Sequence, residues 1–548
     1  MVHTDVADVL IAGAGPVGLT AAVELRRLGA TCRLVDRLPA RLPYAKAVGI
    51  QPRTLEIWDR MGLVRAALEA AVPMRGQLTY INGAEQARLD LALPPEVPYG
   101  FAALPQYETE RILEEFLTRF GTGIERGTEL VSFAQDADGV TSRLVTPSGE
   151  EEVRSRFLVG CDGAHSVVRR ELGLTFEGGA FPEEYMLADV EVDWDLPRGY
   201  GVRAMHHGAD GAVDDLLVCI PLPGERRYRM SMLVPPELSA SRQAGGGDRR
   251  RDGVAHGLEG GPTPSLSDIQ AVLDRLAPQP TTASAMRWSS VFRISHRLVD
   301  RYGDGRVFVA GDAAHIHPPT GAQGMNTGIQ DAYNLAWKLA LAAQGAAHPR
   351  LLTSYDAERR PVGEEVVGRT VRHAAEGVQA DPTDPATLLL REAQLLVGYR
   401  GSPIVGRPYP SRDNGPGPQP GDRAPDCGGL TGEITEYPLR LYDLLRDRGH
   451  LLLLYGNGDA GKTFDELATV ARELSQDKVE ACAVPADGEP AGTRLPVYHD
   501  GRGEFRQRYG VQDPTAFVVR ADGYLGARLS PPTAHELAAH LAGVFRTG

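Results

Sequence analysis

The sequence predicts an α/β protein in which an antiparallel sheet is inserted into a nucleotide-binding domain and a small α/β domain follows. Three observations support this fold class. The chain opens with a strand, a glycine-rich turn, a helix and a second strand. Later segments alternate apolar and polar residues, which is the pattern of half-buried antiparallel strands. Beyond a segment rich in Pro and Gly, residues 401–425, strand and helix patterns alternate again.

The first strand–helix–strand unit lies at the N-terminal end. Val6–Ala12 is a short apolar run, which is typical of a buried parallel strand. Leu19–Leu28 has helical spacing and is ended by Gly29, and Thr31–Val35 reads as the second strand. The sequence therefore predicts a βαβ unit of the Rossmann type.

The turn of this unit reads GAGPVG, and Asp36 follows 18 residues after its last glycine. Gly13 permits the tight turn, Gly15 lets the backbone approach a pyrophosphate, and Gly18 lets the helix and strand pack closely. The helix N-terminus offers N–H groups to the phosphates, and Asp36 can accept a hydrogen bond from a ribose. The pattern predicts a dinucleotide site.

Two later segments complete this site, Phe157–Ser166 (FLVGCDGAHS) and Arg306–His315 (RVFVAGDAAH). Each is an apolar run followed by an aspartate. Together with the N-terminal turn, and in this order, they indicate a protein that binds FAD. Only one GxGxxG unit with a following acid occurs, so we expect a nicotinamide nucleotide to bind transiently in a surface groove.

Alternating strands, such as Gln77–Ile81 and Arg227–Val234, predict the inserted sheet. Within it, Ser241–Pro264 is rich in Gly and Arg and is interpreted as a solvated surface loop, with a lid on the substrate entrance as the alternative. The predicted boundaries are 1–72, 105–180 and 298–400 for the nucleotide-binding domain, 73–104 and 181–297 for the sheet, 401–425 for a linker, and 426–548 for the C-terminal domain.

Two long helices are predicted between the last motif and the linker. Asn326–Ala340 has apolar residues at helical spacing, and a second helix over Arg350–Glu376 is expected to be kinked or divided at Pro361. In the C-terminal domain, His450–Tyr455 and Ala516–Arg520 read as strands.

Composition narrows the possible partners. Of the 548 residues, 42% are hydrophobic and 24% charged, and the net charge of −14 argues against nucleic acid or an anionic membrane as a partner. The five cysteines show no CxxC spacing, which favours a reducing cytoplasm without a disulfide framework. We expect no signal peptide, because the N-terminus lacks a basic region, and no membrane span, because no apolar run approaches about 18 residues.

Three segments carry a resemblance to a known family: Gln51–Ile57 (QPRTLEI), Cys161–Ser166 (CDGAHS) and Gly311–Asn326 (GDAAHIHPPTGAQGMN). Through them the chain resembles the single-component FAD-dependent aromatic hydroxylases, the group A flavoprotein monooxygenases typified by para-hydroxybenzoate hydroxylase. The similarity spans about residues 5–400. The length and the C-terminal extension are most similar to the hydroxylases of aromatic polyketides, such as anthracyclines and angucyclines, and to phenol hydroxylase. This resemblance implies that the extension is a thioredoxin-like domain, here without CxxC.

The resemblance also implies a set of FAD-binding residues. The glycine turn would hold the pyrophosphate, Asp36 with Arg37 the adenosine, and Asp312 the ribityl chain. Lys46 stands where the family usually has an arginine, which keeps the charge but loses the bidentate fork. The full implied set is Gly13, Gly15, Pro16, Val17, Gly18, Asp36, Arg37, Lys46, Gln106, Val131, Asp162, Asp312, Pro319, Gly324, Met325 and Asn326.

The implied reaction is hydroxylation of a phenolic, polycyclic aromatic substrate with NAD(P)H and O₂, through a flavin C4a-hydroperoxide. The family favours NADPH over NADH. The helix that begins near Asn326 would point its positive end at the reduced flavin and stabilise the anion there. No catalytic side chain is expected, because the flavin carries the chemistry and the protein positions it.

Several alternatives remain for the function and for single residues. A flavin-dependent halogenase is disfavoured because no WxWxIP signature occurs, but a dehydrogenase, a Baeyer–Villiger-type oxygenase or a non-catalytic flavin- or ligand-binding protein remains possible. His315 and His317 form an HxH without a third metal ligand, so we expect no metal site. Tyr228 is a candidate substrate contact, with an ordinary sheet position as the alternative. The protein is expected to be a monomer or a homodimer.

Overall fold

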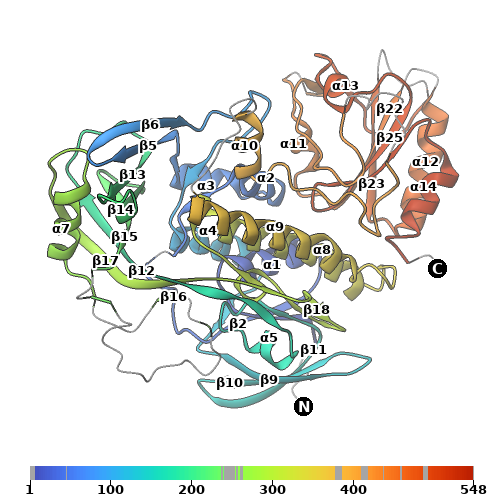
Figure 1. The fold of residues 1–548 in the computed structure, drawn as a ribbon. Helices are drawn as coiled ribbons and strands as arrows, with labels where there is room; N and C mark the ends of the chain where they lie inside the picture. The colour runs from blue at the N-terminus through green and yellow to red at the C-terminus, as the bar shows by residue number, and fades with distance from the viewer. Residues whose placement is uncertain are drawn as a thin grey trace.

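The computed structural model describes residues 6–44, 46–235, 238–239, 254, 257–258, 263–376, 385–408, 417–435, 437–456, 460–485 and 492–546. Within these residues the strands form two large sheets, a four-stranded sheet at the C-terminal end and two small sheets (Figure 1). The chain has a mixed α/β fold, as predicted.

The first large sheet has the predicted parallel βαβ unit at its centre. Its strand order is β18-β19-β11-β1-β2-β8, with β10 and β9 as an antiparallel extension of β11. The strand bounds are β1 (Ala7–Ala12), β2 (Cys32–Asp36), β8 (Ile124–Arg126), β9 (Glu129–Gln135), β10 (Val140–Thr146), β11 (Gly149–Gly160), β18 (Gly303–Asp304) and β19 (Val307–Val309). Neighbouring strands run parallel in the part of the sheet formed by β19, β11, β1, β2 and β8. The carboxyl ends of these strands therefore meet at one edge of the sheet.

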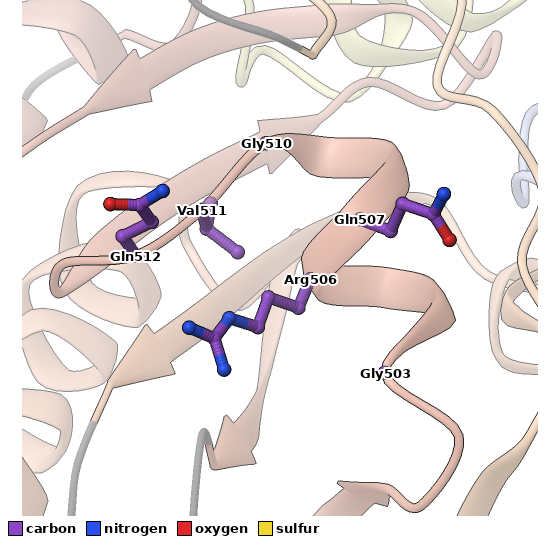
Figure 2. Close-up of a pocket in the computed structure, with 6 residues that line it drawn as sticks. All are labelled: Gly503, Arg506, Gln507, Gly510, Val511 and Gln512. Atoms are coloured by element: carbon purple, nitrogen blue, oxygen red, sulfur yellow. The ribbon is translucent and has the colours of Figure 1, made fainter.

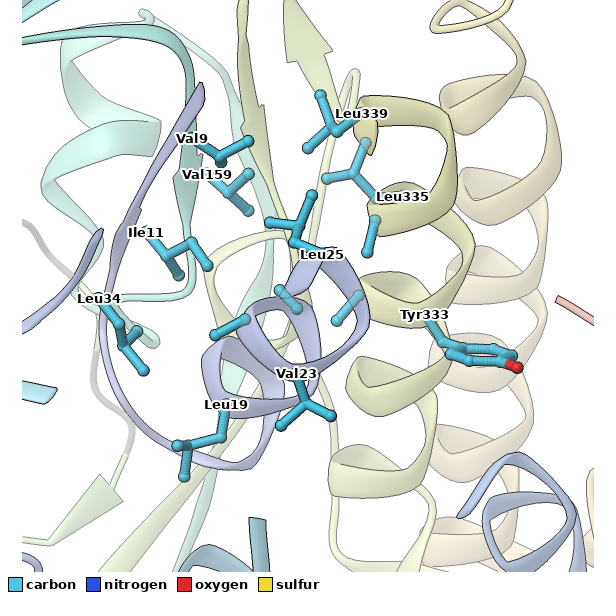
Figure 3. Close-up of a cluster of buried hydrophobic side chains, with 14 of the residues drawn as sticks. Val9, Ile11, Leu19, Val23, Leu25, Leu34, Val159, Tyr333, Leu335 and Leu339 are labelled. Carbon is cyan, nitrogen blue, oxygen red and sulfur yellow. The ribbon is translucent and has the colours of Figure 1, made fainter. Parts of the chain in front are cut away.

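Helix α1 (Pro16–Arg27) packs in the middle of this domain. Pro16 occupies its first turn, where its fixed φ suits a helix start, and Gly29 leaves the helix with φ +83°. Figure 3 shows α1 between the sheet and helix α8 (Gly324–Ala343), with these side chains in contact: Val9, Ile11, Leu19, Val23, Leu25, Leu34, Val159, Leu335 and Leu339. Each fully buried aliphatic side chain of this kind contributes about 1.5–3 kcal/mol to folding.

Helix α8 is longer than the predicted Asn326–Ala340 and is buried along almost its whole length. This burial explains why its apolar residues surround the helix instead of following one stripe. Among the helices that the structure describes, none is both long and apolar enough to cross a bilayer.

The other helices of the first domain surround this core. Their bounds are α2 (Pro52–Met61), α3 (Val64–Ala70), α4 (Gln106–Thr118), α5 (Val167–Glu171), α9 (Ser354–Glu376) and α10 (Pro385–Glu392). A small sheet of β3 (Gly49–Ile50), β4 (Val72–Pro73) and β7 (Ala102–Ala103) connects them, and the short helices η1 (Gly311–Ala313) and η2 (Thr320–Ala322) precede α8.

The prediction that Pro361 divides the second long helix is wrong, because α9 continues through it as one helix. Pro361 removes the hydrogen bond to the carbonyl group of Ala357. Both residues are exposed, so water can bind that carbonyl group and the helix tolerates the loss.

The second large sheet has the order β16-β17-β12-β15-β14-β13-β5-β6, with β20 also paired to β17. The strand bounds are β5 (Gly76–Ile81), β6 (Ala84–Asp90), β12 (Phe176–Val192), β13 (Tyr200–His207), β14 (Val213–Pro221), β15 (Arg227–Leu233), β16 (Gly257–Leu258), β17 (Ala283–Val299) and β20 (His315–Ile316). The sheet is antiparallel as predicted, apart from the parallel pair β5 and β13. The predicted loop Ser241–Pro264 lies outside the described residues except at 254, 257–258 and 263–264.

The two faces of this sheet differ in composition. One face packs against helix α7 (Leu266–Leu276) through an apolar cluster that includes Met186, Val202, Met230 and Met232. The other face is turned toward the first domain and carries polar and aromatic side chains, as described below. This division follows from the two-residue repeat of a strand.

The C-terminal unit, residues 417–546, contains a four-stranded sheet of order β23-β22-β25-β26 and lies beside α2, α8 and α9 (Figure 1). Its elements are β21 (Leu430–Gly432), α11 (Leu441–Leu445), β22 (His450–Gly456), α12 (Gly461–Leu474), β23 (Val479–Pro485), β24 (Tyr498–Asp500), α13 (Glu504–Tyr509), β25 (Thr515–Val519), β26 (Leu525–Leu529) and α14 (Ala534–Leu541).

The predicted linker, residues 401–425, is bound to this unit at both ends, and its residues 409–416 lie outside the described part. The Gly406 amide donates to the Gly526 carbonyl at 2.7 Å, and the Ala424 amide donates to the Gly523 carbonyl at 2.9 Å. Backbone hydrogen bonds therefore fix the described parts of the linker against the sheet.

The turn between β25 and β26, Arg520–Tyr524, packs against the first domain. Arg53 and Arg60 of α2 donate hydrogen bonds to the Asp522 and Ala521 carbonyl groups, at 3.0 Å each. Trp337 of α8 donates to Asp522 Oδ2 at 3.2 Å. The C-terminal unit is thus attached to two helices of the first domain.

Candidate functional site

A cavity of about 440 Å³ lies between the carboxyl ends of the first sheet and the polar face of the second. Most of the predicted site residues line it: Gly13, Gly15, Pro16, Val17, Asp36, Arg37, Lys46, Gln106, Asp162, Asp312, Pro319, Gly324 and Met325. Residues up to 312 positions apart in the sequence thus meet in one place, which makes this cavity the candidate site.

Another hollow, of about 240 Å³, lies on the C-terminal unit around α13 (Figure 2). It is lined by Gly503, Arg506, Gln507, Gly510, Val511 and Gln512. None of the predicted site residues contributes to it.

The three glycines of the N-terminal turn meet different surroundings. Gly13 has φ +100° and lies against the Cys161 carbonyl group, so a side chain there would be strained and would clash. A Cβ atom on Gly18 would strike the Gly13 carbonyl group, whereas a Cβ atom on Gly15 would meet no atom within 4 Å. Gly13 and Gly18 therefore serve close packing, and Gly15 borders the open space of the cavity.

Asp36 fixes the turn to the end of β2. Its Oδ2 accepts a hydrogen bond from the Ala14 amide at 2.7 Å, and its Oδ1 accepts one from the Leu38 amide at 2.8 Å. A carboxylate can accept about four hydrogen bonds, so Asp36 can still receive a ligand hydroxyl group.

The two aspartates of the later motifs both line the cavity with unused acceptor capacity. Asp162 Oδ2 accepts hydrogen bonds from the Val167 and Val168 amides, at 2.7 and 3.2 Å, whereas its Oδ1 is buried and has no partner among the described residues. Burial raises the pKa of Asp162. In the described part of the chain no donor reaches the Asp312 carboxylate, which is only partly buried. A buried acceptor such as Asp162 Oδ1 and an unused carboxylate such as that of Asp312 favour a ligand that brings hydroxyl groups.

These residues fit FAD. The N-terminus of α1 and the open space beside Gly15 suit a diphosphate, because backbone N–H groups at a helix start attract anions. Asp36, Asp162 and Asp312 all line the cavity, where their carboxylates can accept hydrogen bonds from hydroxyl groups. Lys46 and Arg37 add positive charge at the exposed rim of the cavity.

The loop before α8 closes the other end of the cavity. Pro319, Gly324 and Met325 line it, together with Gln323. The N-terminus of α8 lies at the same place, so its partial positive charge acts on whatever occupies this end.

Asn326 differs from the predicted placement, because it does not line the cavity. Its Oδ1 accepts hydrogen bonds from the Gln51 amide at 2.9 Å and the Thr54 hydroxyl at 2.8 Å. Its Nδ2 donates to the Gly49 and Ala322 carbonyl groups at 2.9 and 2.7 Å. All four hydrogen-bonding positions of the amide are used, and Asn326 therefore holds β3 and α2 against the start of α8.

Three other predicted residues also lie outside the cavity wall. Gly18 is packed beneath the turn. Val131 lies in β9, and its neighbour Leu130 lines the cavity in its place. Tyr228 lies on the α7 side of the second sheet, with its ring 5.0 Å from that of Trp194 in an edge-on contact.

Sequence reasoning missed the residues that the second sheet contributes to the cavity. They are Tyr185, Leu187, Ile220, Arg229, Ser231, Phe292 and Ile294. The sequence of β15 could have indicated them. Tyr228, Met230 and Met232 are every second residue of this strand, so they project from one face, and the two methionines mark that face as the one toward the core. The opposite phase contains Arg229 and Ser231.

His315 takes part in a buried charge network beside the cavity. Its Nε2 lies 2.8 Å from Asp331 Oδ2, and Arg359 Nε donates to Asp331 Oδ1 at 2.8 Å. Burial alone would raise the pKa of Asp331, but Arg359 and His315 outweigh it and hold that pKa below its usual value. The described residues contain no cluster of three or more His, Cys, Asp or Glu side chains placed to hold a metal.

Comparisons with known proteins agree with this geometry. Residues 6–370 match the FAD binding domain family. The chain is 34% identical to 6-methylpretetramide 4-monooxygenase of Streptomyces rimosus, over 96% of this chain and 91% of that protein. It is 33% identical to anhydrotetracycline monooxygenase of the same organism, over 96% of each. The crystal structure of aklavinone-11 hydroxylase with FAD and aklavinone covers 98% of this chain and of its own, with 26% identity and a TM-score of 0.75.

Proposed function

Since the chain belongs to the FAD-dependent aromatic hydroxylases, we propose that it hydroxylates a phenolic, polycyclic polyketide with NADPH as electron donor and O₂ as the source of oxygen. The family makes it an FAD-dependent monooxygenase, and the proposal concerns the substrate and the electron donor. The relatives named above act on ring systems of this kind, as their names state.

One observation carries the substrate proposal. The same cavity that reaches the glycine turn also has an apolar wall from the second sheet, formed by Leu187, Phe292 and Ile294. Beside it, the ring of Tyr44 stacks on Trp288 at 4.7 Å with an angle of 10°. A broad apolar surface suits a flat fused-ring molecule, whose burial is favoured by its area.

The residues of this chain bind the cofactor, orient the aromatic substrate and shield the reacting ring from water. FAD supplies the electron transfer and the activation of oxygen. Asp162 and Asp312 can accept hydrogen bonds from hydroxyl groups of the cofactor. The N-terminus of α8 presents a positive partial charge to the end of the cavity. The apolar wall keeps water away from the reacting ring, which strengthens electrostatic interactions there.

We also propose that the C-terminal unit is thioredoxin-like and structural, within the domain boundaries predicted from the sequence. Its order β22-α12-β23 followed by β25-β26-α14, with β22 and β23 parallel, supports this assignment. Cys427 and Cys482 are buried and unpaired, which gives it no reactive dithiol. We further propose that the protein is cytoplasmic, which the five unpaired cysteines support, and that it is a monomer or a homodimer.

The test is an aerobic assay of the FAD-loaded protein with NADPH, ¹⁸O₂ and a panel of phenols, naphthoquinones and tetracyclic polyketides. We expect a tricyclic or tetracyclic phenol to stimulate NADPH oxidation and to gain one ¹⁸O atom by mass spectrometry. Ligand-stimulated NADPH oxidation without an oxygenated product would instead support a dehydrogenase. No stimulation by any ligand would support a non-catalytic binding protein.

A further inference from the structure

The polar face of the second sheet carries a row of three side chains across neighbouring strands. Asp189 of β12 is paired in register with Arg229 of β15 on one side and with Trp288 of β17 on the other. Directly paired residues project from the same face of a sheet. Arg229 and Ser231 of this face line the cavity.

Arg229 is buried, with 4% of its surface exposed, and uses only part of its hydrogen-bonding capacity. Its Nε donates to Asp189 Oδ1 at 2.5 Å, and its guanidinium carbon lies 5.2 Å from the centre of the Trp288 ring. Its two amino groups donate no hydrogen bond to a described residue, and Nη2 is buried. A buried donor without an acceptor is destabilising by about 1–3 kcal/mol, and by more when it is charged.

A second arginine increases the demand for an acceptor on this face. Arg203 of β13 is paired with Val218 of β14, which is paired with Ser231, so all three project from the same side of the sheet. Arg203 forms no ion pair with any described residue, and burial lowers its pKa. Arg229 and Arg203 together therefore bring more positive charge to this face than Asp189 alone offsets.

We propose that Arg229 binds an acidic oxygen of the aromatic substrate, a phenolate or enolate oxygen, and so anchors the oxygen-bearing edge of the ring system. The apolar part of the ligand packs on Leu187, Phe292 and Ile294. Its acidic oxygen accepts hydrogen bonds from the free N–H groups of Arg229. Asp189 and Trp288 hold the guanidinium in place, which makes them positioning residues. This inference rests on the proposed function, because it assigns a contact to the same aromatic ligand.

The test measures equilibrium binding to the FAD-loaded protein without NADPH, from the change in flavin absorbance. The probes are 1,8-dihydroxyanthraquinone and its dimethyl ether, which have the same ring system but differ in acidic oxygens. We expect Arg229→Gln to weaken binding of the dihydroxy probe roughly ten- to a hundredfold, the value of a charge-assisted hydrogen bond. Binding of the dimethyl ether should change little.

Arg227→Gln is the matched control. Arg227 lies on the same strand two residues away, donates to the Pro223 carbonyl group at 3.1 Å and does not line the cavity. Its substitution should leave both dissociation constants unchanged. The flavin-to-protein absorbance ratio of each variant shows whether the cofactor site is intact.

An equal loss for both probes in Arg229→Gln would overturn the proposal, because it would mean that Arg229 only supports the sheet. No loss for either probe would also overturn it. If Arg229→Gln does not fold, Arg229→Lys replaces it, and discrimination between the probes should fall roughly tenfold because an ammonium group lacks the guanidinium fork. Unchanged discrimination in that variant would contradict the proposal.

The outcome is separable from that of the proposed function. Selective loss in Arg229→Gln, with no hydroxylated product from the wild-type protein, would support the anchor and reject the hydroxylation. Hydroxylation by the wild-type protein, with unchanged probe binding in Arg229→Gln, would support the proposed function and reject the anchor.

Discussion

Arg520 of the C-terminal unit forms a double ion pair with Glu358 of α9, from Nη1 to Oε1 at 2.7 Å and from Nη2 to Oε2 at 2.8 Å. Both side chains are buried. Glu358 also accepts hydrogen bonds from Lys338 and Asn334 of α8, at 2.8 and 2.7 Å. One carboxylate therefore joins two helices of the first domain to the C-terminal unit.

Glu358→Ala should lower the free energy of unfolding by about 3–5 kcal/mol, because it leaves Lys338 buried without an acidic partner and Arg520 with Asp522 alone. Urea denaturation followed by circular dichroism measures this. Glu69→Ala is the control, since it removes an ion pair with Arg65 that is exposed on the surface, and surface pairs contribute little. Similar losses in the two variants would contradict the prediction.

Gly15→Val should fold but retain little FAD, because a Cβ atom there meets no protein atom within 4 Å and the side chain would fill the open space beside the turn. Gly18→Val should instead destabilise the fold, since its side chain would strike the Gly13 carbonyl group. Thermal unfolding and the ratio of flavin to protein absorbance separate the two effects. A Gly15→Val protein that purifies with full, tightly bound FAD would show that the cofactor is misplaced.

Asp312→Ala should weaken FAD binding by about 1.5–3 kcal/mol, or roughly ten- to a hundredfold, because it removes an acceptor for a ligand hydroxyl group. Titration of the apoprotein with FAD, followed by flavin fluorescence, gives the dissociation constant. Asp312 makes no contact with a described donor, so the stability of the apoprotein should not fall. A large loss of apoprotein stability would point to a structural role.

Acid should destabilise the protein in part through His450. Burial, and after it the charges of Arg520, Arg60 and His540, lower the pKa of His450 to about 3. The unfolded chain takes up a proton near pH 6.5 and the folded protein does not, so stability is complete above pH 6.5 and is lost as the pH falls toward 3. The loss can reach about 4–5 kcal/mol. His450→Phe should flatten the stability curve between pH 6.5 and 4, measured by urea denaturation, and an unchanged slope would exclude His450 as the cause.

Local signals allowed much of the cofactor cavity to be predicted. Gly15, Gly18 and Asp36 have roles that depend on the first βαβ unit, and the strand ends of a parallel sheet meet at one edge. Asn326 does not line the cavity, because its amide bonds to Gly49 and Gln51, far away in the sequence. No local pattern reveals such a contact.

The substrate face was harder to predict, because it depends on which strands become neighbours. The alternation of β15 separates Tyr228 from Arg229, but only the pairing with β12 and β17 brings Asp189 and Trp288 beside that arginine. The undivided helix α9 has a similar explanation. Whether Pro361 breaks it depends on the exposure of Ala357 to water, which the sequence does not specify.

The packing of the β25–β26 turn against α2 and α8 has a consequence for cooperativity. If either part opened alone, the double ion pair of Glu358 and Arg520 would break, leaving Glu358 only Lys338 and Arg520 only Asp522 as a charged partner. A calorimetric scan should therefore show a single endotherm for the two domains, although small domains joined by a linker often melt independently. Either part expressed on its own should have a lower free energy of unfolding, because it would lose the packing and the ion pair that it shares with the other part. This chain is therefore a poor candidate for engineering one domain at a time.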